Sequence, residues 1–179
     1  MFFKKANNKR DKNKKDDSFK IPLSAKDAAL ASIVGAIYVV LTLGFAPISF
    51  GPIQFRIAEI LTVLPFLRAS TAWGLFAGCL VANIIGGLGP WDIILGSLCT
   101  LIAAYLTSKM PNIWLAPLPP VIINAFGVSL YLSKIFGFPY WLTVLSIGVS
   151  ETIICYLLGI PLLYFLKKQN FLEEYIFKQ

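Results

Sequence analysis

The sequence contains no histidine and few charged residues. Only 14% of its 179 residues are charged, whereas 57% are apolar. The absence of histidine weighs against zinc hydrolysis and against a serine nucleophile activated by histidine. The sequence also has no Gly-rich phosphate-binding loop of the Walker type, so it does not hydrolyse ATP through that motif. We therefore expect a protein that is not an enzyme and that needs no metal and no cofactor.

Cysteine is also scarce. The three cysteines, Cys79, Cys99 and Cys155, lie in apolar runs without close spacing. This pattern fits neither a disulfide framework nor a metal site, so we interpret them as small packing residues.

The composition predicts an integral membrane protein. So few polar groups cannot cover the apolar surface of a soluble domain, and the mean hydropathy is +0.73. A chain of 179 residues can supply about six membrane spans of roughly 20 residues each. We expect an all-α membrane domain of six transmembrane helices over residues 24–168, between tails at 1–23 and 169–179.

The positive charge of the sequence is concentrated near its start. Nine of the sixteen Lys and Arg residues precede residue 27, in a segment that we expect to be a disordered tail. A basic segment beside a membrane span attracts anionic lipids and fixes orientation. Because no aromatic side chains alternate with these charges to stack on bases, we expect contact with membrane lipids and not with nucleic acid.

Six apolar segments are predicted to be spans, at residues 25–46, 57–67, 72–85, 92–108, 113–132 and 140–166. Ser24 and Asp27 fit a capping box at the start of the first. Residues 46–55 contain two prolines and a glycine, which should prevent a regular helix. The second segment is too short to cross a bilayer alone.

The distribution of basic residues predicts the orientation. Six spans place both ends on one side, and the basic tail assigns that side to the cytoplasm. Arg68, Lys109 and Lys167 then also lie inside, whereas Arg56 and Lys134 lie outside.

Several ionisable and amide side chains interrupt the apolar segments. A charge in the membrane interior costs a few kcal/mol and usually serves to bind or move something. The predicted topology brings these groups together in the outer half of the membrane, so we expect them to form a substrate pocket open to the outside. The candidate residues are Gln54, Arg56, Glu59, Asn83, Trp91, Asp92, Asn124 and Glu151.

Structural roles remain open for most of these residues. Arg56 and Glu59, three positions apart, could pair with each other on one helical face, and Arg56 could instead reach lipid headgroups. Asp92 could cap a helix, and the asparagines could join helices by hydrogen bonds. Trp91 could belong to an aromatic belt at the membrane surface.

Small residues recur four positions apart on the first span. This spacing lets a second helix approach closely in a bilayer, so we expect the span to meet a partner inside or outside the bundle. The residues are Ala25, Ala28, Ala29, Ala31, Ser32, Gly35 and Ala36.

Particular runs of the sequence carry a family resemblance. They are residues 36–43, 49–65 with its Gln-Phe-Arg-x-x-Glu element, 82–87 and 91–97, together with Asn124 and Glu151. From these the sequence resembles the QueT family of substrate-binding (S) components of energy-coupling factor (ECF) transporters. The resemblance extends over most of residues 25–168.

The resemblance implies a subunit of an importer in the bacterial cytoplasmic membrane. Its partners would be EcfT, a transmembrane coupling protein that contacts the small-residue face of the first span, and two cytosolic ATPase subunits. The implied cargo is a queuosine precursor, a deazaguanine such as preQ1, preQ0 or queuine.

The implied ligand suggests a role for each site residue. Glu151 or Glu59 would accept hydrogen bonds from N1–H and the 2-amino group, because one carboxylate can accept both. Asn83, Asn124 and Gln54 would contact the other polar atoms, and Asp92 would bind the ammonium group of preQ1.

Other functions are compatible with the same residues. The nearest is an S component for another vitamin, such as thiamine or riboflavin. Alternatively, the protein could be a stand-alone proton-coupled carrier that uses Glu59, Asp92 and Glu151 as a relay. A membrane enzyme would need a metal held by paired carboxylates, and no spacing of that kind is present.

Overall fold

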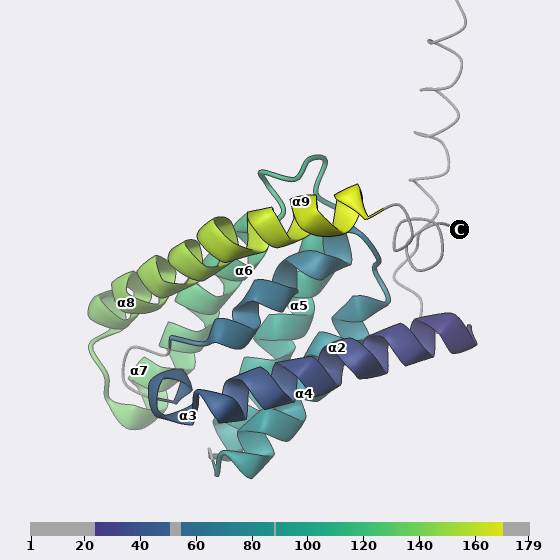
Figure 1. Ribbon diagram of the computed structural model, residues 1–179. Helices are drawn as coiled ribbons and strands as arrows, with labels where there is room; N and C mark the ends of the chain where they lie inside the picture. Colours follow the sequence, from purple (N-terminus) through teal and green to yellow (C-terminus); the bar gives the residue numbers. More distant parts are fainter. Residues whose placement is uncertain (1–23, 51–54, 88, 170–179) are drawn as a thin grey trace, which may run out of the picture.

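The computed structural model of the protein describes residues 24–50, 55–87 and 89–169 (Figure 1). All regular elements within these ranges are helices, so the predicted all-α class is confirmed. Gln54 and both predicted tails, apart from Gln169, lie outside the described residues.

Helix α2 (Ala25–Gly44) begins at the predicted cap. The backbone N–H of Asp27 donates to Ser24 Oγ at 3.1 Å. The Asp27 carboxylate also accepts bonds of 2.8 Å from Arg68 Nε and from Ser70 Oγ. These bonds tie the start of α2 to the turn before α4.

The segment after α2 differs from the expectation. We predicted no regular helix over 46–55, but Ala46–Ser49 forms one helical turn, α3. Pro47 is tolerated there because the first turn of a helix does not use its backbone N–H groups.

The second predicted span is the 3₁₀ helix η1 (Ile57–Phe66), with Pro65 inside it. At about 2.0 Å per residue its 10 residues extend about 20 Å, still less than a bilayer core of about 30 Å. The expectation that this segment is too short to cross alone is therefore confirmed.

The third and fourth predicted spans agree with the structure to within one residue. They are α4 (Thr71–Ile85) and a continuous helix made of the π-helical segment η2 (Asp92–Gly96) and α5 (Ser97–Ser108).

The predicted bounds of the fifth span are wrong at both ends. The helix runs through α6 (Leu118–Ile123), the π-helical segment η3 (Asn124–Val128) and α7 (Ser129–Phe136). Residues 113–117 form turns, and the helix starts where prolines 119 and 120 occupy its first turn. It ends at Gly137, which adopts φ 73°.

The sixth span is one helix made of α8 (Tyr140–Thr152), the π-helical segment η4 (Ile153–Gly159) and α9 (Ile160–Lys168). It ends two residues beyond the predicted limit. Pro161 cannot donate a backbone bond, and its ring would clash with the carbonyl of Leu157 in a regular α-helix. The wider π segment before it accommodates the proline.

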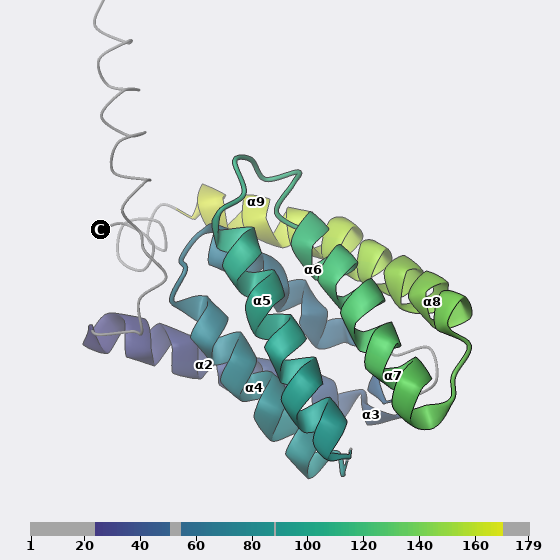
Figure 2. The same ribbon diagram turned by 180° about the vertical axis from the view of Figure 1, so that it is seen from behind.

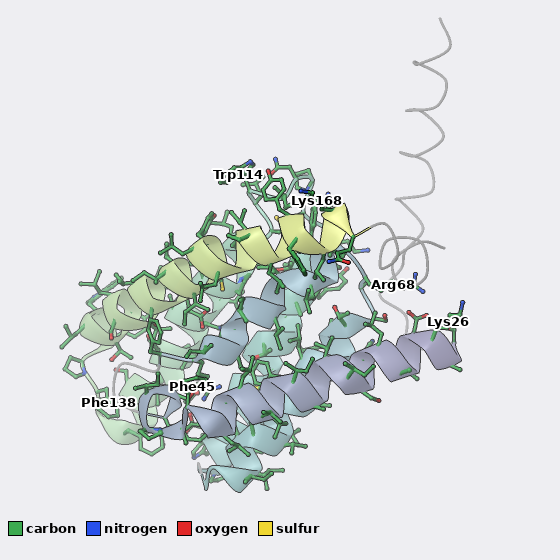
Figure 3. All side chains as sticks on the ribbon, viewed as in Figure 1. Lys26, Phe45, Arg68, Trp114, Phe138 and Lys168 are labelled. Atoms are coloured by element: carbon green, nitrogen blue, oxygen red, sulfur yellow. The ribbon has the colours of Figure 1, made fainter. Side chains whose placement is uncertain are left out.

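Three of the described helices are long and apolar enough to cross a membrane, namely Ala25–Gly44, Leu118–Phe136 and Tyr140–Lys168. The apolar helices Ile57–Phe66, Thr71–Ile85 and Asp92–Ser108 are shorter. Many large apolar side chains are exposed on the bundle, among them Val40, Trp141 and Leu157. Figure 3 shows Lys26, Arg68 and Lys168 toward one end, with Phe45 and Phe138 at the opposite end.

Helix η1 lies at the centre of the bundle and contacts α2, α5 and η4. Figure 2 shows α4, α5 and α6–α7 side by side, with α8 next to α6–α7. Helices α2 and α4 approach closely through their glycines: a Cβ at Gly78 would lie 2.7 Å from the carbonyl oxygen of Gly35.

Candidate functional site

Glu59 is buried at the centre of the bundle, near the start of η1. Its Oε1 accepts a 2.6 Å hydrogen bond from the hydroxyl of Tyr38 on α2. Its Oε2 accepts a longer bond, 3.4 Å, from Nδ2 of Asn124 on η3. Three elements far apart in the sequence thus meet at one carboxyl group.

Glu151, near the end of α8, is the second carboxyl group of this cluster. Its Oε1 accepts a 2.9 Å bond from the same Asn124 Nδ2, and its Oε2 accepts one from the thiol of Cys155 at 3.4 Å. Each of the four carboxyl oxygens of Glu59 and Glu151 therefore accepts one described hydrogen bond.

Arg56, directly before η1, supplies a positive charge and is only 8% exposed. The proposed pair with Glu59 is not formed: among residues 24–50, 55–87 and 89–169 the salt bridge is that of Arg68 with Asp27. Instead, Arg56 Nη1 lies 3.7 Å from Cys79 Sγ, and its guanidinium carbon lies 5.8 Å from the Phe50 ring centre. Because Arg56 is buried, its side chain does not reach lipid headgroups.

Asp92 and Asn83 form an adjoining polar cluster. The Asp92 carboxylate accepts a 2.9 Å bond from the hydroxyl of Tyr131, and its backbone carbonyl accepts one of 2.9 Å from Asn83 Nδ2. The Asp92 side chain therefore contacts α7 and does not cap its own helix.

The polar groups surround a small cavity of about 10 Å³. This is roughly the room that one water molecule needs. Asp92 does not line the cavity itself, but it accepts a hydrogen bond from Tyr131, which does. The cavity is lined by Arg56, Glu59, Gly96, Thr100, Asn124, Val128, Tyr131, Ile147 and Glu151.

Three buried atoms near the cavity have no hydrogen-bond partner within the described part of the chain. They are the donor Arg56 Nε and the acceptors Asn83 Oδ1 and Asn124 Oδ1. An unsatisfied buried polar atom costs about 1–3 kcal/mol, so such atoms call for an explanation. A polar ligand that offers both acceptors and donors would satisfy them.

Among the described residues, the buried acidic side chains are Glu59, Asp92 and Glu151, and the buried basic ones are Arg56 and Arg68. Arg68 is paired with Asp27. Within the described ranges no three His, Cys, Asp or Glu side chains are grouped so as to hold a metal ion.

Three of the helices that carry these carboxyl and amide groups contain a π-helical segment. Asp92 and Asn124 are the first residues of η2 and η3, and Glu151 lies two residues before η4. π-helical segments are rare and occur often at functional sites.

Comparison with known families identifies the family of the chain. The sequence model described as QueT transporter matches residues 28–168. The chain belongs to the QueT transporter family. Every described polar residue of the cluster falls within the matched range.

One similar protein is the Queuosine precursor transporter QueT of Lactococcus lactis subsp. cremoris (strain MG1363). It is 38% identical to this chain over 79 residues, which are 42% of this chain and 46% of that protein. The match therefore spans about half the length of the curated relative. No solved structure matches the chain.

The structure of this QueT-family chain unites most of the predicted residues. Arg56, Glu59, Asn124 and Glu151 line one cavity, and Asn83 and Asp92 adjoin it. Trp91 does not join them: it is 49% exposed, because neighbours on a helix point about 100° apart and Asp92 takes the inward position.

Sequence reasoning missed Tyr38, Thr100 and Tyr131. Tyr38 and Tyr131 hydrogen-bond to site carboxylates, and Thr100 lines the cavity. In apolar spans these residues resemble packing residues. The useful signal is that a buried tyrosine hydroxyl needs a partner.

The small-residue face of α2 is divided. Ala31 and Gly35 are buried against α4, whereas Ala25, Ala28, Ala29, Ser32 and Ala36 are exposed. Several of the exposed residues border an apolar groove of about 450 Å³ between the two helices. Its lining residues are Ala28, Ala31, Ser32, Gly35, Ala36, Val39, Trp73, Gly74, Ala77, Gly78 and Val81.

Proposed function

We propose that this protein is the substrate-binding component of an ECF-type importer and that it binds a queuosine precursor, a deazaguanine, from outside the cell. The observation that carries the proposal is the pair of carboxylates, Glu59 and Glu151, joined by Asn124 in the interior of a QueT-family bundle. The curated relative is named for a queuosine precursor, which supports the same cargo.

The chemistry of the cluster suits a deazaguanine. The ring presents N1–H and a 2-amino group on one edge, and a single carboxylate can accept both bonds. Either Glu151 or Glu59 takes this edge. The unpartnered Nε of Arg56 is a donor for the ring carbonyl. Gln54 lies outside the described residues, and its predicted contact with another polar atom of the ligand remains part of this proposal.

PreQ1 is the best match among these compounds, because its aminomethyl group is a cation that a buried carboxylate can bind. Asp92 or a glutamate of the pair receives the ammonium. PreQ0 carries an uncharged nitrile at the same place and leaves this charge uncompensated.

Binding requires the cavity to widen. Its volume of about 10 Å³ is far below the roughly 300–1,000 Å³ of typical small-molecule sites. The side chains that bound it belong to separate helices, so helix displacement and side-chain rotation both enlarge it.

The orientation follows from the charged end of the bundle. The end with Lys26, Arg68 and Lys168 (Figure 3) faces the cytoplasm under the positive-inside rule. The groove between α2 and α4 receives a helix of the coupling protein EcfT, and two cytosolic ATPase subunits supply the energy.

The deciding experiment is calorimetric binding to the detergent-purified protein with preQ1, preQ0, queuine, guanine, thiamine and riboflavin. We expect the tightest binding for preQ1 and weak binding for guanine. Tight binding of thiamine or riboflavin would contradict the proposed ligand but would support the role as a substrate-binding component. No binding of any compound, together with proton-dependent flux in liposomes holding this protein alone, would overturn the proposal as a whole.

A further inference from the structure

Cys79, on α4, lies directly behind the cavity and is fully buried. Hydrogen-bond donors from three parts of the chain surround its sulfur. Arg56 Nη1 lies 3.7 Å away, Asn83 Nδ2 3.6 Å and Thr100 Oγ1 3.5 Å. Cys79 packs in the hydrophobic core as predicted, and its sulfur also accepts contacts from these three donors.

Two of these donors belong to residues that line the cavity, Arg56 and Thr100. The contacts described for the Arg56 guanidinium are the sulfur of Cys79 and the ring of Phe50. Its Nε has no partner in the described part of the chain. The Nη1 atom of the guanidinium thus contacts the sulfur, and the Nε atom can donate a hydrogen bond to a ligand.

We propose that Cys79 is a positioning residue that orients the Arg56 guanidinium toward the ligand. An arginine side chain loses considerable rotamer entropy when it is fixed, and its planar group binds well only in one orientation. The sulfur supplies that restraint by direct contact with Nη1, and no salt bridge of Arg56 is formed within the described residues. The inference rests on the proposed function, because it gives Arg56 a ligand to contact.

A double-mutant cycle on the binding of preQ1 tests this coupling. Cys79→Ala should weaken binding by about 10-fold, the size expected for a lost bond to a charged group. Cys79→Ser should restore affinity to within about threefold, because a hydroxyl also accepts hydrogen bonds. In an Arg56→Lys background, Cys79→Ala should cause no further loss, because the ammonium group has no planar orientation to preserve.

Cys99→Ala is the matched control, since it removes a thiol from α5 that has no described bond to Arg56. It should leave the affinity unchanged. Equal losses from Cys79→Ala in the wild-type and Arg56→Lys backgrounds would overturn the inference, because a purely structural defect would act in both.

A readout without ligand separates this inference from the proposed function. The chain has three arginines, Arg10, Arg56 and Arg68. Arginine labelled with nitrogen-15 therefore gives few side-chain NMR signals. The signal that disappears in Arg56→Lys is the signal of Arg56. We expect slow rotation of the Arg56 Nη groups in the wild type and in Cys99→Ala, and fast rotation in Cys79→Ala. Unchanged rotation in Cys79→Ala would refute the restraint even if no deazaguanine binds.

Discussion

Glu59 and Glu151 share one hydrogen-bond donor, the Nδ2 atom of Asn124, at 3.4 Å and 2.9 Å. A donor between two carboxyl groups reduces their mutual repulsion. Asn124 therefore joins the two carboxyl groups as well as lining the cavity.

Replacing Asn124 by aspartate should be strongly disruptive. The change removes the shared donor and adds a third negative charge, so we expect a lower melting temperature and a loss of deazaguanine affinity of about 10-fold or more. The matched control is Asn112→Asp at an exposed turn, where the new carboxylate can still accept the bond from the Leu115 N–H. Equal melting temperatures for the two variants would contradict the role of Asn124.

Glu151→Gln should weaken binding of a deazaguanine by about 10-fold or more. A charge-assisted hydrogen bond contributes about 1.5–3 kcal/mol, and the amide also turns one acceptor into a donor. Calorimetry on the purified variant measures the change. Unchanged affinity would remove Glu151 from the binding site.

Tyr38→Phe should destabilise the bundle by about 1.5–3 kcal/mol. It removes the donor that lies 2.6 Å from Glu59 Oε1 and leaves a buried charge with one bond fewer. Tyr164→Phe is the control, because Tyr164 is 51% exposed on α9 and should change the stability by less than about 0.5 kcal/mol. Denaturation in mixed micelles compares the two, and equal effects would argue against the importance of this bond.

Gly74→Ala should separate α2 from α4. A Cβ at Gly74 would collide with the carbonyl oxygen of Ala31, whereas a Cβ at Gly44 would meet nothing within 4 Å. We expect a loss of about 1–3 kcal/mol or more for Gly74→Ala and little change for Gly44→Ala. Similar melting temperatures for both would show that the helices do not pack this closely.

Ala36→Trp should block coupling to the ATPase module without affecting ligand capture. Ala36 borders the groove between α2 and α4, about 450 Å³ in volume, which a tryptophan would fill. We expect normal ligand binding by the purified protein but no uptake in vesicles containing all subunits. Leu157→Trp, at another exposed apolar position, should permit uptake. Normal uptake with Ala36→Trp would place the partner elsewhere.

Much of the fold could be predicted from the sequence because the apolar runs are long and their ends are marked by prolines, glycines and charges. The bounds of α4 and of the helix from Asp92 to Ser108 agree to within one residue. The start of the fifth helix was misplaced because Ile113 and Trp114 are apolar residues in a turn, and hydrophobicity alone does not separate an apolar turn from a helix.

The site could be predicted in part because a charge in an apolar span is conspicuous. Arg56, Glu59 and Glu151 were found for that reason. Their partners were not, since a tyrosine such as Tyr38 or a cysteine such as Cys79 is ordinary in a membrane helix. What distinguishes them is which atoms they contact across the bundle, and that depends on how each helix is rotated about its own axis.

The narrow cavity has a consequence for the rate of capture. A bundle with only about 10 Å³ between its polar side chains cannot admit a bicyclic ring without first opening. The observed association rate should then level off at high ligand concentration, at a value equal to the rate of helix opening. A preformed pocket would instead give an association rate that rises linearly with ligand concentration. Tight capture would arise mainly from slow dissociation, and a bound molecule would remain in place long enough for a much slower encounter with the coupling subunits in the membrane.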